Sequence, residues 1–140
     1  MMNAENPGRP TILFLCVENS CRSQIAEAYA KTLLSDICDS YSSGSKPSGQ
    51  VNPKAIASMD RAGYDMNRHT SKPIDELPTK RFDIAITMGC GDFCPDIKAG
   101  HSEDWAIPDP KHLNSSEFDQ IRDQIKNRVE DLRTLLLQSA

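Results

Sequence analysis

The residues with the most evident chemistry lie between positions 16 and 23. Cys16 and Arg22 are separated by five residues, and Ser23 follows the arginine directly. An apolar run from Thr11 to Val17 precedes this group, and a helix-like stretch from Gln24 to Leu34 follows it. The pattern predicts a tight connection, here called the oxyanion loop (residues 16–22), between a buried strand and a helix.

Such a loop would bind an oxyanion and carry its own nucleophile. Unpaired N–H groups at a helix start point into the loop, and the helix dipole adds positive charge there. The Cys16 sulfur would lie over these groups, which favours a reactive thiolate, and Arg22 could hold two oxygens of a tetrahedral anion. The predicted oxyanion-binding residues are Val17, Glu18, Asn19, Ser20, Cys21, Arg22 and Ser23.

Smaller features of the loop support this interpretation. The hydroxyls of Ser20 and Ser23 could donate to the sulfur, and Asn19 tolerates a positive φ. The plain alternative is a buried structural cysteine and a surface arginine. The strand before the loop, the helix after it and Ser23 beside the arginine favour the functional interpretation.

Three more candidate residues follow later strand-like runs. Cys90 and Cys94 come after the apolar run 82–88, among two glycines and a proline, which predicts a mobile loop or a frayed helical turn. Asp109 lies between two prolines that stiffen its loop. A carboxyl group above an anion site could protonate a leaving oxygen, whereas the alternative is that Asp109 only caps a turn.

Alternating elements must position these residues. Strands are expected at 11–17, 39–43, 82–88 and around 104–107, helices at 20–34, 52–63 and 116–138, and a loop at 96–100. This order predicts a single α/β domain with a four-stranded parallel sheet and helices on both faces. Because parallel strands end at one rim, we expect Cys16, Cys90 and Asp109 to meet there.

Composition narrows the class of protein. The 140 residues are 38% hydrophobic and 26% charged, as in a soluble globular domain, and the net charge of -4 argues against nucleic acid as partner. No run approaches the ~20 apolar residues of a membrane span. Residues 1–10 have no signal-peptide features, and we expect them to form a disordered N-terminal segment. We expect residues 11–140 to form the domain. Five cysteines, an odd number, fit a reduced cytoplasmic protein better than a secreted one.

Several segments together carry a resemblance. They are CVENSCRSQIAEAYA, NPKAIASMDRAGYD, the pair Cys90 and Cys94, and Asp109-Pro110. In these features, and in their order, the chain resembles the thiol-dependent arsenate reductases built on the low-molecular-weight protein tyrosine phosphatase fold. The resemblance implies arsenate as substrate, phosphate as competitor, no cofactor, and thioredoxin or another dithiol or thiol as reductant.

The resemblance also implies a thiol relay. Cys16 would attack arsenate while Asp109 protonates the departing oxygen, and Cys90 would then attack Cys16 and release arsenite. Cys94 would move the resulting disulfide to a Cys90–Cys94 pair that thioredoxin can reduce. The best-known members place more residues between the second and third thiols than the three found here.

A potassium site is a further implication of the resemblance. Its candidate ligands are Asn19, Glu27, Ser42 or Ser43, and Asp65, although a solvated glutamate and a turn serine explain the spacing equally well. The isolated histidines have no second ligand at metal-binding spacing, so we expect structural roles for them and no zinc site.

Two other functions compete with arsenate reduction. A low-molecular-weight phosphatase would need only Cys16, Arg22 and an acid, and has no use for two further thiols. A non-catalytic arsenite or redox sensor would use the thiols but would not need Arg22 or Asp109.

Overall fold

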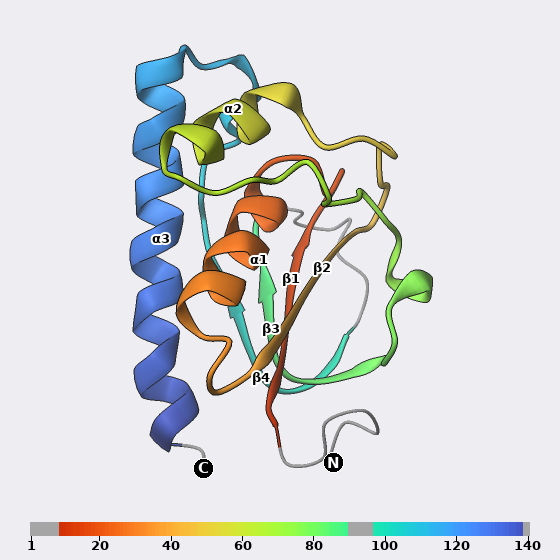
Figure 1. Ribbon diagram of the computed structural model, residues 1–140. Coiled ribbons are helices and arrows are strands. Elements are labelled where there is room, and N and C mark those ends of the chain that lie inside the picture. The colour runs from red at the N-terminus through yellow and green to blue at the C-terminus, as the bar shows by residue number, and fades with distance from the viewer. Residues whose placement is uncertain (1–8, 90–96, 139–140) are drawn as a thin grey trace.

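The computed structural model of the protein describes residues 9–89 and 97–138. The elements follow one another as β1 (Thr11–Cys16), α1 (Arg22–Leu33), β2 (Asp39–Gly44), α2 (Pro53–Arg61), η1 (Ile74–Glu76), β3 (Arg81–Thr87), β4 (Lys98–Asp104), η3 (Pro110–His112) and α3 (Ser115–Gln138), where η denotes a 3-10 helix. Figure 1 shows the strands side by side, with the long helix α3 at one flank. The expected alternation of strands and helices is confirmed.

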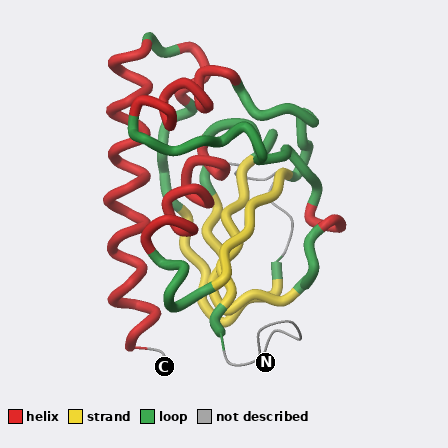
Figure 2. Tube along the Cα trace, viewed as in Figure 1, coloured by secondary structure: helices red, strands yellow, loops and turns green. Residues whose placement is uncertain are grey.

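The strands form one parallel sheet in the order β2-β1-β3-β4. β1 is therefore central, and β2 lies at an edge as its polar sequence predicted. Residue Ile12 of β1 is in register with Ser40 of β2 and Ile84 of β3. All strands run the same way, as the arrows in Figure 1 show, so their carboxyl ends meet at one rim. Figure 2 shows the loops that continue from the strands.

The two faces of the sheet are covered differently. Ile12, Phe14 and Cys16 of β1 belong to the main core cluster, which contains the buried apolar residues of all three α-helices. Leu13 points to the other face, where it packs in a smaller cluster with Leu77, the residue that directly follows η1. Helix α1 lies between α3 and the sheet (Figure 1). The functional loop therefore begins on a fully buried central strand.

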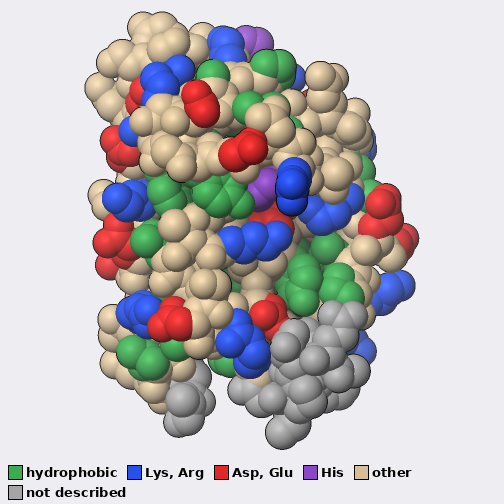
Figure 3. Space-filling view, in the orientation of Figure 1, with side chains coloured by type: hydrophobic (Ala, Val, Ile, Leu, Met, Phe, Trp, Pro, Cys, Tyr) green, Lys and Arg blue, Asp and Glu red, His purple; other side chains and the backbone are tan. Residues whose placement is uncertain are grey.

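Helix α3 has the amphipathic pattern that the sequence predicted. Its buried residues recur every three or four positions and are Phe118, Ile121, Ile125, Val129, Leu132 and Leu136. They pack chiefly against α1 and α2. On the face shown in Figure 3, acidic and basic side chains are interspersed. Ion pairs of the helices include Lys31 with Glu27 and Arg133 with Asp36.

The fourth strand was placed wrongly from the sequence. β4 spans Lys98–Asp104, where a loop was expected at 96–100, and it ends where a strand was expected around 104–107. Most β4 residues are exposed and polar, so no apolar alternation marks the strand; its pairing with β3 defines it. The apolar signal came from Trp105 and Ile107, which are buried just beyond the strand end.

Of the predicted disordered lead, residues 1–8 lie outside the described residues. Arg9 is held in place: its guanidinium donates to the carboxylate of Asp39 at 3.2 Å and to the carbonyl oxygens of Ser35 and Cys38 at 2.6 and 2.8 Å. Across residues 9–89 and 97–138, no helix has the length and apolar character needed to cross a membrane.

Candidate active site

The oxyanion loop turns its carbonyl groups outward. Four carbonyl oxygens each accept a hydrogen bond from outside the loop: Val17 from Lys46 N at 2.8 Å, Glu18 from Ser48 N at 3.1 Å, Asn19 from Gln24 Nε2 at 3.0 Å and Ser20 from Asn52 N at 3.0 Å. In the described part of the chain, the backbone N–H groups of residues 17–21 donate to no acceptor. The loop therefore has the unpaired N–H groups that the sequence predicted, and its capacity to hold an anion stays a prediction.

Asn19 fixes the shape of the loop. Its φ of 52° is the one positive value among the described residues other than glycine, as predicted. Its fully buried side chain accepts from the backbone N–H of Lys72 at 3.0 Å and donates to the hydroxyl of Ser23 at 2.7 Å. One side chain thus ties the loop to α1 and to the segment after α2.

The two serine hydroxyls have different partners. Ser23 Oγ lies 2.9 Å from Cys16 Sγ, so the predicted contact between these two side chains is present. Ser20 Oγ instead donates to Cys21 Sγ, at 4.0 Å. The prediction that Ser20 serves the Cys16 sulfur is therefore wrong, because the hydroxyl turns to the neighbouring thiol.

Arg22 and Asp109 are far apart in the sequence but close in the structure. Arg22 Nη1 donates to the carbonyl oxygen of Ile107 at 3.1 Å, and Nη2 lies 3.9 Å from Asp109 Oδ2. The other carboxylate oxygen of Asp109 accepts from Lys111 N at 3.1 Å and caps η3. The two interpretations of Asp109 are thus compatible, since one oxygen caps the turn while the other lies near the arginine.

Two glycines allow this close packing, and the sequence alone did not reveal that role. Gly89 has a φ of 80°, and a Cβ there would collide with the Arg22 guanidinium. A Cβ at Gly44 would lie 2.6 Å from the carbonyl oxygen of Val17. Gly44 ends β2 and Gly89 follows β3, both at the rim of the sheet. A glycine at such a position often marks a place where another part of the chain approaches the backbone closely.

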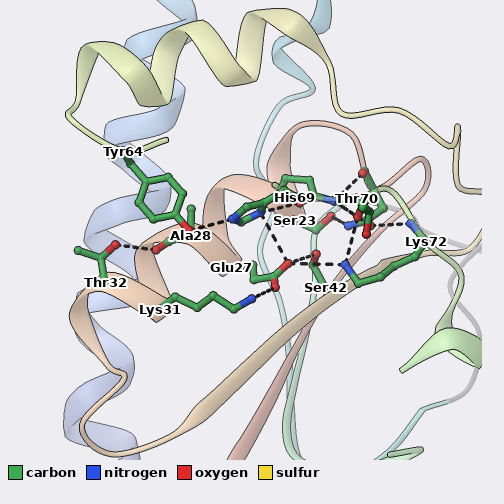
Figure 4. Close-up of polar contacts among 12 residues, drawn as sticks. Ser23, Glu27, Ala28, Lys31, Thr32, Ser42, Tyr64, His69, Thr70 and Lys72 are labelled. Carbon is green, nitrogen blue, oxygen red and sulfur yellow. Dashed lines mark hydrogen bonds and ion pairs between the residues drawn. The ribbon is translucent and has the colours of Figure 1, made fainter. Parts of the chain in front are cut away.

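A buried polar network between α1 and the segment after α2 supports the oxyanion loop (Figure 4). Gln24 Nε2 donates to Asn19 Oδ1 at 2.9 Å and to the Thr70 carbonyl at 2.8 Å, which leaves Gln24 Oε1 to accept from His69 Nδ1 at 2.9 Å. His69 Nε2 lies 2.8 Å from Tyr64 Oη, a hydrogen bond in which either atom can donate. Burial lowers the pKa of His69, which favours the neutral imidazole. His69 has the structural role expected of it.

Of the potassium candidates, Glu27 and Ser42 are in contact, and two lysines also lie against Glu27. Glu27 accepts from Ser42 Oγ and Lys31 Nζ, both at 2.5 Å, and Lys72 Nζ lies 3.8 Å away. Burial acts to raise the pKa of Glu27, but the ammonium groups of Lys72 and Lys31 outweigh it, so the pKa lies below its usual value. Asp65 is exposed and accepts instead from Asn67.

Three cysteines can be compared directly, because Cys90 and Cys94 lie outside the described residues. Cys16, Cys21 and Cys38 are all buried free thiols. Burial raises the pKa of Cys21 to about 11 and that of Cys38 to about 12. Both therefore favour the protonated thiol near neutral pH, which makes them weak nucleophiles.

Residues 11–139 match the family described as low molecular weight phosphotyrosine protein phosphatase. The chain belongs to this family. It is also 40% identical over 130 residues to an arsenate reductase of Staphylococcus aureus (strain Newman), a match that covers 90% of this chain and 98% of the relative. The resemblance drawn from the sequence is confirmed.

Solved structures show the same likeness. An arsenate reductase in the phosphate-binding state superposes with a TM-score of 0.82 at 37% identity, covering 91% of this chain and 98% of the other. A thioredoxin-dependent arsenate reductase of Corynebacterium glutamicum gives 0.76 at 29% identity, covering 94% of this chain and 64% of the other. The parallel four-stranded architecture is thus shared with arsenate reductases.

Proposed function

We propose that this protein reduces arsenate to arsenite with Cys16 as the nucleophile. The observation that carries the proposal is the oxyanion loop, whose N–H groups are free of acceptors in the described part of the chain while Cys16 Sγ lies at its start and Arg22 at its end. A tetrahedral oxyanion fits such a loop. The Staphylococcus aureus relative and the superposed structures are named arsenate reductases, which supports arsenate as the substrate.

The first step forms a bond between the Cys16 sulfur and arsenic. One arsenate oxygen leaves as water after it receives a proton, and Asp109 is the proposed donor because its Oδ2 lies 3.9 Å from Arg22 Nη2. Arg22 and the loop N–H groups hold the remaining oxygens and stabilise the charge that develops on them. Phosphate has the same shape and competes for the site.

Two electrons must then reach arsenic, and thiols supply them. Cys90 attacks Cys16, a Cys16–Cys90 disulfide forms, and the electron pair of the broken sulfur–arsenic bond stays on arsenic as arsenite departs. Cys94 attacks Cys90 and frees Cys16, which leaves a Cys90–Cys94 disulfide for thioredoxin or a similar dithiol. The relay needs no resident cofactor or metal. Because it needs reduced thiols, we infer that the protein works in the cytoplasm.

Phosphoester hydrolysis is the second candidate. The family bears the name of phosphotyrosine phosphatases, and Cys16, Arg22 and Asp109 are the groups that such hydrolysis requires. The two activities differ in their use of Cys90 and Cys94, since only arsenate reduction consumes thiols.

The decisive experiment follows NADPH oxidation by the purified protein with thioredoxin and thioredoxin reductase, with and without arsenate. We expect arsenate-dependent turnover that disappears in Cys16→Ser and Cys90→Ser. In Cys94→Ser, one round of reduction should survive while multiple turnover stops. Hydrolysis of an aryl phosphate without any arsenate turnover would instead support the phosphatase.

A further inference from the structure

An ion pair joins the oxyanion loop to the segment that carries Asp109. Glu18 Oε2 lies 3.3 Å from Lys111 Nζ, although the two residues are 93 positions apart. Glu18 belongs to the loop, and Lys111 lies in η3, two residues after Asp109. The pair thus lies beside the proposed oxyanion site, and neither the loop chemistry nor the thiol relay uses it.

Both ends of the pair are anchored through their backbones. The Glu18 carbonyl oxygen accepts from Ser48 N at 3.1 Å and from Ser71 Oγ at 2.8 Å. The Lys111 carbonyl oxygen accepts from Lys54 Nζ at 3.1 Å, and Lys111 N donates to the Asp109 carboxylate. Two fixed backbones therefore hold the charged side chains within reach of each other.

Glu18 creates an electrostatic conflict that this contact resolves. A carboxylate on a loop that binds an oxyanion repels the ligand, because like charges a few ångströms apart disfavour binding. Lys111 supplies the opposite charge at 3.3 Å, and its side chain is held next to the loop even though 44% of its surface is exposed. The charge of the loop is therefore compensated by a residue far along the chain.

We propose that Lys111 is a positioning residue of the oxyanion site, which pairs with Glu18 and keeps its carboxylate from opposing the bound anion. Oxyanion affinity then depends on a lysine that contacts no substrate atom. The inference rests on the proposed function, because arsenate, with phosphate as its analogue, is the ligand whose affinity is affected.

The test compares Lys111→Gln with the wild type. The variant leaves Glu18 unpaired, so we expect the KM for arsenate and the Kd for inorganic phosphate to rise about threefold to tenfold, with a smaller change in kcat. The double variant Glu18→Gln/Lys111→Gln removes both charges and keeps the backbone N–H of residue 18, so it should recover affinity relative to Lys111→Gln. Lys111→Arg keeps the charge and should bind phosphate like the wild type.

Lys80→Gln is the matched control, because Lys80 also forms an exposed ion pair, with Asp75 at 3.4 Å, and precedes β3 at the opposite end of the sheet. It should leave the Kd for phosphate unchanged. Unchanged affinity in Lys111→Gln, or failure of the double variant to recover, would overturn the inference alone. A wild type that binds no phosphate and reduces no arsenate would overturn the proposed function and the inference together.

Discussion

The sulfur of Cys16 lies 2.9 Å from the hydroxyl oxygen of Ser23, and that oxygen also accepts a hydrogen bond from a third residue, Asn19. Asn19 Nδ2 donates to the same hydroxyl oxygen at 2.7 Å, so the Ser23 proton is free to point at the sulfur. Cys16 is only 3% exposed, and water cannot readily replace this donor. Ser23 is therefore placed to donate to the Cys16 sulfur when that sulfur acts as a nucleophile.

Ser23→Ala should slow the reaction of Cys16. A hydrogen bond to a charged group contributes about 1.5–3 kcal/mol, so we expect roughly a tenfold or greater loss in the rate of Cys16 alkylation by iodoacetamide and in arsenate turnover. Mass spectrometry of the modified peptide measures the first. Ser20→Ala is the control, since its hydroxyl donates to Cys21, and it should react like the wild type. Equal rates in the two variants would refute the assignment.

Gly89→Ala should weaken oxyanion binding through Arg22. An added Cβ would displace the guanidinium, and alanine also costs about 1–2 kcal/mol at a left-handed φ such as the 80° of Gly89. We expect the Kd for phosphate to rise at least about tenfold, measured by calorimetric titration. Gly63→Ala separates the two effects, because Gly63 has a φ of 89° but an added Cβ there would meet no atom within 4 Å. It should lose thermal stability only.

Much of the site could be read from local sequence. The positive φ of Asn19, the position of Cys16 at a strand end and the parallel sheet all follow from patterns within a few residues of each element. Contacts between distant residues could not be read in this way. The Glu18–Lys111 pair spans 93 positions, and the closeness of Gly89 to Arg22 depends on how β3 and α1 meet at the rim.

The fourth strand was missed for a related reason. Periodicity detects a strand only when one of its faces is buried, and β4 is an edge strand with mostly exposed residues. Its position is set by pairing with β3, from Arg81↔Lys98 to Thr87↔Asp104. Such pairing is a property of the tertiary structure.

Potassium should have no specific effect on this protein. Glu27 already has the ammonium groups of Lys31 and Lys72 beside it, at 2.5 and 3.8 Å, and Asp65 does not join the group. We expect the same Tm and the same KM for arsenate in potassium chloride and in choline chloride of equal ionic strength. A rise in Tm with potassium alone would show that a cation still binds beside Glu27.

The free energy of unfolding should fall at alkaline pH because of two buried thiols. Burial raises the pKa of Cys21 to about 11 and of Cys38 to about 12, whereas the pKa of a cysteine in the unfolded chain is about 8.5. Below that value both states hold the proton and stability is constant. As the pH rises, the unfolded state loses its protons first, and stability declines until the folded thiols titrate.

For each thiol, the free energy of unfolding should be about 1–2 kcal/mol lower at pH 10 than at pH 8. Urea unfolding at pH 8, 9 and 10, with a reductant present, measures this loss. The double variant Cys21→Ser/Cys38→Ala removes both thiols, so its stability should decline less over the same interval, although it is lower at pH 8. If the variant and the wild type lost equal stability between pH 8 and pH 10, other groups would be responsible. The partly buried hydroxyls of Tyr29 and Tyr64, whose pKa values burial also raises, would then be the candidates.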